Sequence, residues 1–457
     1  MTETLSKISD WLIAASDFIC GYPEFFLLIG GGLFLFIYSG GVSLRRVPWS
    51  LRALRQKQAK DAGKETGQIS SFQALMSAIA ATVGMGNIAG VAIALSIGGP
   101  GVIFWMWVSA IVGMSTKFFE GTLAIMYKGR DSDGEIQGGP MYVITEGLGK
   151  RWKPLANAFA IFGLVGTLCF MQANQLVESV TTVFTTPMGI ENTTWLRFAM
   201  GVVIVLIVGT VILGGINRIA KTASKIVPLM VTLYLILVAI IMVLNYDKIP
   251  GVFTQIIDGA FHPAGIAGGF TLIALTGARR AAMVNEAGVG TASMMHGASM
   301  NTEPVREGLV AMIAPLIDSG IVCTLTAIPI IIAGQDIGTG EVTGGLYIAL
   351  GAFGQLIPHI GQYLLMAIVF FFAFSTMFSY SYYGQKCTNF LFGAKNAKYY
   401  NYYYLIMIIV AAVIKLDVLV SVMDLAFALM ALCTMITLIA LSPKVKRETK
   451  KYFKDHR

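Results

Sequence analysis

The chain has 457 residues, of which 56% are hydrophobic and 13% are charged, with a mean hydropathy of +0.71 and a formal net charge of +8. This composition excludes a soluble globular domain and indicates an integral membrane protein. Clusters of charge bound the long apolar runs, which predicts an all-α protein of membrane-spanning helices rather than an outer-membrane β-barrel. Because the basic residues lie at the edges of these runs, membrane topology explains them, and we expect the lipid bilayer but no nucleic acid as a partner.

The residues that could bind metals, form disulfides or catalyse reactions do not fall at the spacings that these functions require. The five cysteines are scattered without a CxxC motif, and the four histidines never fall at metal-ligand spacing. No Ser/His/Asp, metal or phosphate-loop constellation is found, so the sequence predicts neither an enzyme nor an organic cofactor. Residues 1–20 lack the basic start and apolar core of a signal peptide, and they include an amphipathic segment expected on the membrane surface.

Eleven membrane crossings are predicted in chain order. They lie at residues 25–42, 73–96, 101–127, 155–185, 197–215, 226–245, 265–292, 307–333, 360–383, 401–416 and 418–441. A basic run follows the first crossing, and basic loops remain in the cytoplasm. One alternation of sides then satisfies every loop, which predicts a multi-pass protein of the plasma (inner) membrane with its N-terminus outside and its C-terminus in the cytoplasm.

The loops differ in charge between the two predicted sides. The cytoplasmic side receives the basic residues Arg45, Arg46, Arg52, Arg55, Lys57, Lys60, Lys64, Lys128, Arg130, Lys150, Arg151, Lys153, Arg218, Lys221, Lys225, Lys386, Lys395, Lys398, Lys444, Lys446, Arg447, Lys450, Lys451, Lys454 and Arg457. The outer side receives lightly charged loops with Glu191, Asp247, Asp258, Asp336 and Glu341.

The second crossing contains an interruption. The stretch from Gln73 to Ser96 carries no charge, yet its middle reads VGMGN (83–87). Glycine costs about 1 kcal/mol relative to alanine inside a helix, and freed backbone groups in hydrocarbon cost several kcal/mol each without a polar partner. One interpretation is a broken helix that faces a cavity holding a polar or ionic ligand. The other is a glycine-lined packing face between helices.

A second interruption lies in TGARRAAMVNEAGVG (276–290), where Arg279, Arg280 and Glu286 fall in or near an apolar crossing. An ionisable group inside a span is usually functional. Alternatively, the two arginines lie at the cytoplasmic end and extend their charged groups to the interface. For Glu286 we favour a structural or gating ion pair over a substrate contact.

Hydroxyls form a third polar feature in FFFAFSTMFSYSYYG (370–384). Such hydroxyls usually donate to the carbonyl one turn earlier. A hard cation such as Na⁺ prefers oxygen ligands, so Ser375 and Thr376 together with freed carbonyls would also suit it.

Other polar groups also lie inside crossings. Gln172, Asn174 and Gln175 either hold helices together or line a pathway. Asp318 is a candidate for proton coupling or a partner in an internal hydrogen bond.

The crossings divide into two halves if the first helix is peripheral. Residues 1–69 then hold that helix and the basic loop, 70–250 and 251–441 hold five crossings each, and 442–457 form a basic cytoplasmic tail. The two interruptions fall in the first helix of each half. Corresponding interruptions in two halves are the strongest sequence indication of a transporter binding site.

Several motifs resemble the alanine/glycine:cation symporter family, also called the sodium:alanine symporters. They are FQALMSAIAATVGMGNIAGVA (72–92), GGPGVIFWMWVSAIVG (98–113), GGPMY (138–142), VILGGI (211–216), NEAGVG (285–290) and SYYGQKC (381–387). They span nearly the whole chain in the family's order. The resemblance implies one extra helix followed by a five-plus-five inverted-repeat core of the LeuT type with two broken helices.

The resemblance also implies site residues. The substrate carboxylate would meet backbone amides at Met85, Gly86 and Asn87, and the ammonium would meet carbonyls near Thr82. The second break would contribute Met283, Val284, Asn285, Glu286 and Ala287. A sodium site would combine the carbonyls of Ala80 and Val83 with the hydroxyls of Ser375 and Thr376, and Gln172 and Tyr380 resemble pocket-lining positions.

The main prediction is therefore a secondary active transporter that carries a small neutral amino acid, alanine or glycine, into the cell with Na⁺ as the coupling ion. Family members often carry Thr, Phe and Trp where this chain has Met85, Met283 and Tyr380. Because methionine side chains adapt to a broader pocket, sodium- or proton-coupled uptake of a larger neutral amino acid such as glutamine is the alternative. Glu286 and Asp318 favour the proton. A channel or a receptor is a further alternative, and the sequence makes no prediction of oligomeric state.

Overall fold

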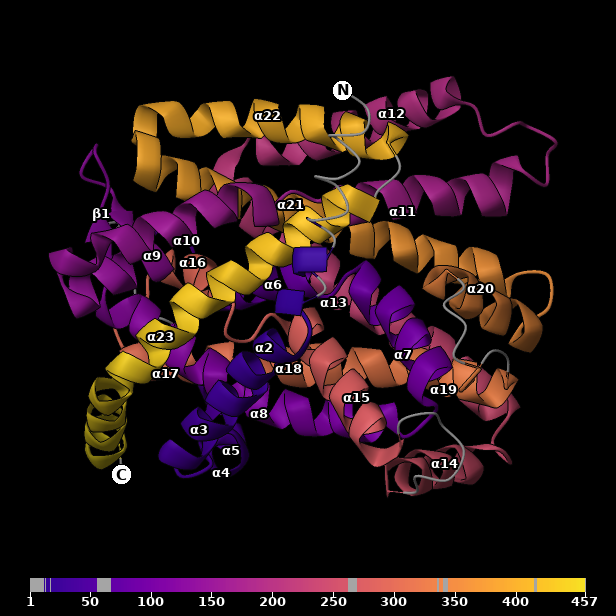
Figure 1. Ribbon diagram of the computed structural model, residues 1–457, viewed down its shortest axis with the longest axis horizontal. Helices are drawn as coiled ribbons and strands as arrows, with labels where there is room; N and C mark the ends of the chain where they lie inside the picture. Colours follow the sequence, from indigo (N-terminus) through magenta and orange to yellow (C-terminus); the bar gives the residue numbers. More distant parts are fainter. Residues whose placement is uncertain are drawn as a thin grey trace.

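A computed structural model describes residues 12, 14–16, 18–55, 67–261, 269–334, 337–339, 344–414 and 417–456 (Figure 1). Several predicted features lie outside the described residues. These are most of the amphipathic segment within residues 1–20, the ends of the predicted crossings at 265–268 and 415–416, and the charged residues Lys57, Lys60, Lys64, Asp336, Glu341 and Arg457.

The fold is helical, with one short β-hairpin in the described part of the chain. The first half contains α2 Tyr22–Phe25, α3 Gly31–Tyr38, α4 Val42–Arg45, α5 Val47–Arg55, α6 Ser71–Thr82, α7 Val91–Gly98, α8 Val102–Met126, β1 Gly129–Arg130, β2 Ile136–Gln137, α9 Pro140–Tyr142, α10 Lys153–Gly166, α11 Phe170–Val180, α12 Thr194–Ile212 and α13 Gly215–Leu244. The second half contains α14 Ile249–Phe261, α15 Gly269–Asn285, α16 Thr291–Gly297, α17 Pro304–Ala311, α18 Ile313–Pro315, α19 Cys323–Ala333, α20 Gly345–Leu356, α21 Gly361–Phe392, α22 Ala394–Val413 and α23 Asp417–Asp455.

Short π-helical and 3₁₀ stretches join several of these helices. The π-helical stretches are Phe26–Gly30, Gly86–Gly90, Val143–Leu148, Thr181–Thr185 and Leu316–Val322, and Lys150–Trp152 is a 3₁₀ turn. Single π-helical turns often mark functional positions in helices, and three of these stretches, Phe26–Gly30, Gly86–Gly90 and Leu316–Val322, belong to the site described below.

Seven helical segments within the described residues are long and apolar enough to cross a membrane, and one bent pair brings the number to eight. They are Val102–Met126, Lys150–Thr185, Thr194–Ile212, Gly215–Leu244, Pro304–Ala333, Gly361–Phe392 and Ser421–Asp455, with the bent pair Ser71–Thr82 and Gly86–Gly98. Each overlaps a predicted crossing. The other three predicted crossings correspond to the shorter apolar segment Tyr22–Tyr38, to α15 with α16, and to α22.

Helix α8 lies at the centre of the packing and contacts both α15 and α17 (Figure 1). Glycines allow this close approach. A Cβ added to Gly121 on α8 would lie 2.7 Å from the Cβ of Ala311 on α17, which real side chains do not tolerate. Close backbone contact through small residues is a common way for helices to pack in membranes.

Loops and helix ends that the sequence places on the cytoplasmic side of the membrane are neighbours in the structure. Lys128, after α8, donates from Nζ to the carbonyl of Ser299 at 2.6 Å. Lys444, near the end of α23, donates to the carbonyl of Gly147 at 3.1 Å. Two helices that the sequence did not predict, α14 and α20, lie between crossings and are too short to span a bilayer.

Candidate functional site

Helix α6 ends at Thr82, and residues 83–85, here called the first break, separate it from the helical turns that begin at Gly86. The two helical parts are bent by 55°. The side chain of Asn87 stabilises the interruption, because its Oδ1 accepts a hydrogen bond from the backbone N–H of Gly84 at 2.8 Å. The broken-helix interpretation of this stretch therefore describes the structure better than a continuous packing face.

A second interruption, residues 286–290, separates α15 from α16 and is here called the second break. Glu286 has φ 51°, and Gly288 and Gly290 have φ 96° and 95°, a region that favours glycine. Side chains satisfy the freed backbone: Asn285 Oδ1 accepts from the N–H of Ala287 at 2.9 Å, and Glu120 Oε1 accepts from the N–H of Gly288 at 2.6 Å.

The two breaks are connected through neighbouring residues of one π-helical stretch, Leu316–Val322. Asn87 donates from Nδ2 to the carboxylate of Asp318. Asn285 donates from Nδ2 to the hydroxyl of Ser319 at 3.2 Å. All four side chains are buried. Asp318 therefore has the role of an internal hydrogen-bond acceptor, one of the two roles considered from the sequence.

A cavity of about 350 Å³ lies between the two breaks. Seven of the predicted substrate residues line it: Thr82, Gly86, Gln172, Met283, Val284, Glu286 and Tyr380. Its remaining lining consists of Glu24, Leu28, Ala81, Gly84, Ala89, Gly90, Ile93, Met171, Gln175, Arg280, Val289, Met423, Asp424 and Phe427. The first helical segment, Tyr22–Tyr38, contributes Glu24 and Leu28 to this cavity.

The other four predicted substrate residues do not line the cavity. Met85 is buried, and Asn87 turns its side chain toward Gly84 and Asp318. Asn285 and Ala287 face Gly113 of α8, since a Cβ on that glycine would lie 3.2 Å from Asn285 Nδ2 and 3.3 Å from Ala287 Cβ. Met85 and Ala287 belong to the breaks themselves, and the side chains of Asn87 and Asn285 accept hydrogen bonds from backbone N–H groups within them.

Glu286 is an acid in the wall of the cavity whose carboxylate accepts two side-chain hydrogen bonds. Tyr380 on α21 and Thr291 on α16 both donate hydroxyl hydrogen bonds to its carboxylate. Lys117 on α8 donates to its backbone carbonyl at 3.1 Å and lies 3.8 Å from Glu120. Lys117 and Glu120 are both fully buried, and sequence analysis missed them. Two ionisable residues inside an apolar crossing are the signal that could have identified them.

Gln172 and Gln175 on α11 face the cavity with free acceptors. Among the residues that the structure describes, neither side-chain carbonyl accepts a hydrogen bond. A buried acceptor without a partner is costly, so both amides are suited to a polar ligand. Asn174 instead donates to the carbonyl of Ala411 at 2.9 Å and holds α11 against α22. Of the two sequence interpretations, Gln172 and Gln175 therefore fit the lining of a pathway, and Asn174 fits the role of holding helices together.

Oxygen atoms converge where α21 passes the first break. The hydroxyl of Thr376 donates to the carbonyl of Ala80 at 3.2 Å and to the carbonyl of Phe372 at 3.1 Å. Ser375 donates to the same Phe372 carbonyl at 3.0 Å. A Cβ added to Gly84 would lie 2.6 Å from the Thr376 hydroxyl, so the break and this hydroxyl are in direct contact. The two hydroxyls and the two carbonyls are oxygen ligands of the kind that hard cations prefer.

A helical membrane protein with two interrupted helices around a polar cavity has the architecture of a secondary transporter. The family model described as the sodium:alanine symporter family matches residues 5–457. The chain belongs to this family, which confirms the resemblance seen in its motifs.

Known proteins with similar sequences and structures agree with this assignment. The chain is 36% identical over 445 residues to the sodium/alanine symporter AgcS of Methanococcus maripaludis, covering 96% of this chain and 95% of AgcS. It is 33% identical over 445 residues to the probable sodium/glutamine symporter GlnT of Bacillus subtilis, covering 96% and 89%. The crystal structure of MhsT in complex with L-phenylalanine has a similar fold, with a TM-score of 0.58, 15% identity, and 82% of this chain and 89% of MhsT covered.

Proposed function

We propose that the protein is a sodium-coupled symporter that brings a small neutral amino acid, alanine or glycine, into the cell by alternating access. The observation that carries this proposal is the cavity between the two breaks, with the oxygen cluster of Thr376 next to it. Coupling requires that the ion favour the conformation that binds substrate, because an ion with equal affinity for both conformations shifts nothing. An ion ligand in contact with the first break provides such a connection.

Eleven crossings form the proposed architecture, with one additional helix and two five-helix inverted repeats at 70–250 and 251–441. The N-terminus lies outside, and the tail 442–457 lies in the cytoplasm. The contacts Lys128–Ser299 and Lys444–Gly147 support the prediction that these basic ends share one side. The excess of basic residues there supports the cytoplasm of the plasma (inner) membrane as that side.

The substrate is proposed to bind as a zwitterion across the cavity. Its carboxylate meets the backbone N–H groups at Gly86, where a helical segment begins and its dipole is positive. Its ammonium meets carbonyls near Thr82 and at Met283 and Val284, with the carboxylate of Glu286 nearby. Met85, Asn87, Asn285 and Ala287 act by holding the two breaks in place.

Sodium is proposed to bind between α6 and α21. The carbonyls of Ala80 and Val83 and the hydroxyls of Ser375 and Thr376 would supply its ligands, as the resemblance implies. The Phe372 carbonyl joins this set, because both hydroxyls already lie 3.0 to 3.1 Å from it.

Uptake into proteoliposomes tests the proposal. Labelled alanine should accumulate when a Na⁺ gradient is imposed, and it should not accumulate when choline replaces Na⁺ at fixed pH. Accumulation that follows a proton gradient and ignores Na⁺ would exclude sodium coupling and favour Glu286 or Asp318 as the coupling group. Conduction that does not saturate with substrate would identify a channel.

A larger neutral amino acid such as glutamine is the second candidate substrate. The cavity volume of about 350 Å³ lies within the range of pockets that hold drug-sized ligands, and an alanine would leave much of it unfilled. Met171 and Met283 line it with adaptable side chains, and Gln172 and Gln175 offer amide groups that could pair with a side-chain amide. Competition by unlabelled amino acids against labelled alanine distinguishes the candidates, since the natural substrate should compete at the lowest concentration.

A further inference from the structure

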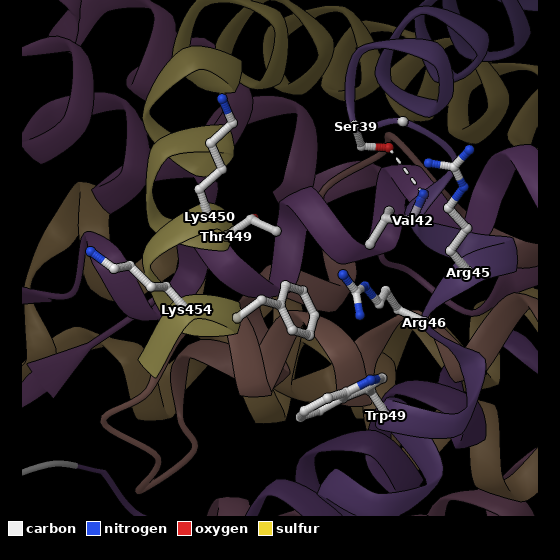
Figure 2. Close-up of a pocket in the computed structure, with 10 residues that line it drawn as sticks. Ser39, Val42, Arg45, Arg46, Trp49, Thr449, Lys450 and Lys454 are labelled. Atoms are coloured by element: carbon white, nitrogen blue, oxygen red, sulfur yellow. Dashed lines mark hydrogen bonds between the residues drawn. The ribbon is translucent and has the colours of Figure 1, made fainter. Parts of the chain in front are cut away.

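A second cavity, of about 640 Å³, lies where the end of α3 and helices α4 and α5 meet the last turns of α23 (Figure 2). Arg45, Arg46 and Trp49 form one wall, and Lys450, Phe453 and Lys454 come from α23. We refer to this cavity as the basic pocket. It joins residues about 400 positions apart in the sequence.

Four cationic side chains, Arg45, Arg46, Lys450 and Lys454, line the basic pocket. Across the described part of the chain, no ion pair joins Arg45, Arg46, Lys450 or Lys454 to a carboxylate. Like charges gathered in one cavity repel, and a bound anion removes that repulsion. The pocket therefore has the charge of an anion-binding site.

Aromatic rings hold one of the cations in place. The guanidinium of Arg46 lies 3.9 Å from the ring centroid of Phe453, a cation–π contact. Phe453 packs edge-on against Trp49, with the ring centroids 5.2 Å apart. Stacking leaves the N–H groups at the edge of the guanidinium free to donate, and their planar arrangement matches phosphate oxygens.

The surroundings of the pocket place it at the boundary between lipid and water. Phe34 and Ile37 on α3 are exposed apolar residues that lie five and two positions before Ser39, where the pocket begins. Leu44 and Leu51 are exposed beside Arg45 and Arg52, so α4 and α5 present apolar and basic side chains together. Short helices with this composition lie in the interfacial plane of a membrane.

We propose that the basic pocket binds the phosphodiester headgroup of an anionic phospholipid such as phosphatidylglycerol. The phosphate oxygens accept from Arg46 and from the lysines at the rim, and the acyl chains extend along the exposed apolar side chains of α3 and α4. The bound headgroup connects α4 and α5 to the end of α23. Helix α17 contacts both α5 and α23. Next to these contacts, His456 Nε2, one residue after α23, lies 3.5 Å from Oε1 of Glu303, the residue before α17. The proposal does not depend on which substrate the cavity between the breaks carries.

Binding to the purified full-length protein in a neutral detergent tests the proposal. Native mass spectrometry measures the adducts formed with phosphatidylglycerol, with phosphatidylcholine and with inorganic phosphate at equal concentrations. Each cation near an anionic lipid contributes about a fivefold factor in affinity. We expect Arg46→Gln combined with Lys450→Gln to bind phosphatidylglycerol about 25-fold more weakly. The matched control is Lys395→Gln combined with Lys398→Gln, which removes the same charge from exposed positions of α22.

Each outcome decides the proposal. Saturable binding of phosphatidylglycerol that the pocket variant loses and the control keeps supports it. Equal binding by both variants overturns it, as does equal binding of phosphatidylcholine. Inorganic phosphate that binds as tightly as the lipid overturns the lipid as occupant and identifies a site for a soluble anion. If the double variant does not fold, Lys450→Gln alone replaces it, since Lys450 is exposed and the expected loss is about fivefold.

Discussion

The carboxylate of Asp318 accepts a hydrogen bond from the side-chain amide of Asn87, which in turn accepts one from the backbone N–H of Gly84 in the first break. The next residue, Ser319, accepts from Asn285 behind the second break. One short π-helical stretch thus fixes the position of both interruptions. Transport by variants of Asp318 distinguishes a structural role for its carboxylate from a role in carrying protons.

Asp318→Asn should retain most of the transport activity, because an amide oxygen can still accept from Asn87. Asp318→Leu should lose it, because the buried Asn87 amide would keep only the weak acceptor Cys323 Sγ at 3.6 Å, and a poorly satisfied buried donor costs about 1–3 kcal/mol. Initial rates of Na⁺-driven uptake measure both. Loss of transport in Asp318→Asn with normal folding would indicate that the charge itself, and therefore the proton, is required.

Removal of the Thr376 hydroxyl should weaken sodium binding. Thr376→Ala is expected to raise the Na⁺ concentration for half-maximal uptake about tenfold or more, because an oxygen bound to a charged group contributes about 1.5–3 kcal/mol. Ser375→Ala should act in the same direction, and Thr376→Ser should preserve the sodium dependence. Ser381→Ala on the same helix is the control, since its hydroxyl donates to the carbonyl of Phe378 at 2.7 Å and to no other described residue. Unchanged sodium dependence in Thr376→Ala would remove the proposed ion site.

A bulky side chain at Gly86 should abolish substrate binding without preventing membrane insertion. A Cβ at this position lies 3.5 Å from Val284 Cγ2, an ordinary contact, so Gly86→Ala should be tolerated. The additional methyl groups of Gly86→Val extend into the cavity. Equilibrium binding of labelled alanine measures the loss. Gly251→Val is the control, because Gly251 on α14 has no atom within 4 Å of its added Cβ; normal binding by Gly86→Val would contradict the proposed substrate position.

Tyr380→Phe should weaken substrate binding because it removes the hydroxyl that donates to Glu286 at the wall of the cavity. We expect about a tenfold higher substrate KM, the effect of one hydrogen bond to a charged group. Tyr383→Phe is a matched control, since the Tyr383 hydroxyl is buried and has no hydrogen-bond partner among the described residues. Equal effects of the two substitutions would indicate packing rather than the contact with Glu286.

Asp131 connects the β1–β2 hairpin to the end of α21 and should make that contact sensitive to acid. Burial raises the pKa of Asp131, but hydrogen bonds from Asn389, Gln137 and two backbone N–H groups outweigh it and hold the pKa below its usual 3.8. A lowered pKa stabilises the folded state above pH 3.8, and this contribution is lost as the pH falls through the lower, folded value.

Asp131→Ala should therefore loosen the hairpin at neutral pH by about 0.5 kcal/mol for each lost hydrogen bond, given its exposure. Limited proteolysis between β1 and α9 measures this. Asp133→Ala is the control, since Asp133 is exposed and, among the described residues, its carboxylate accepts a hydrogen bond from Ser132 alone, at 3.4 Å. Equal cleavage of both variants would show that Asp131 does not hold the hairpin.

Sequence patterns identified the features that depend on local chemistry. The glycines at 84 and 86 beside Asn87 indicated either a broken helix or a glycine-lined packing face, and the structure shows the break. Glu286 with Gly288 and Gly290 indicated the second break, although it begins after Asn285 and extends to Gly290. The hydroxyls at 375 and 376 predicted the oxygen cluster, and the Phe372 carbonyl follows from helical geometry alone.

Features that depend on distant contacts were not predictable in this way. Asn87 and Asp318 are 231 positions apart, and no periodicity relates them. The contribution of Glu24 to the cavity depends on how the first helix packs against α15 and α23. The basic pocket joins the basic run after the first crossing to the basic tail, and nothing in the sequence relates these two segments.

The asparagine contacts behind the two breaks have a consequence for ligand selectivity. Because side chains of the protein already satisfy Gly84 and Ala287, the unwound shape is a property of the folded chain. An amino acid that enters therefore meets a preorganised receptor and loses little affinity to ordering the backbone. The side chains that face the bound amino acid then determine which amino acids bind. Substitutions at Met283 or Gln172 should therefore change specificity without changing the backbone of the two breaks.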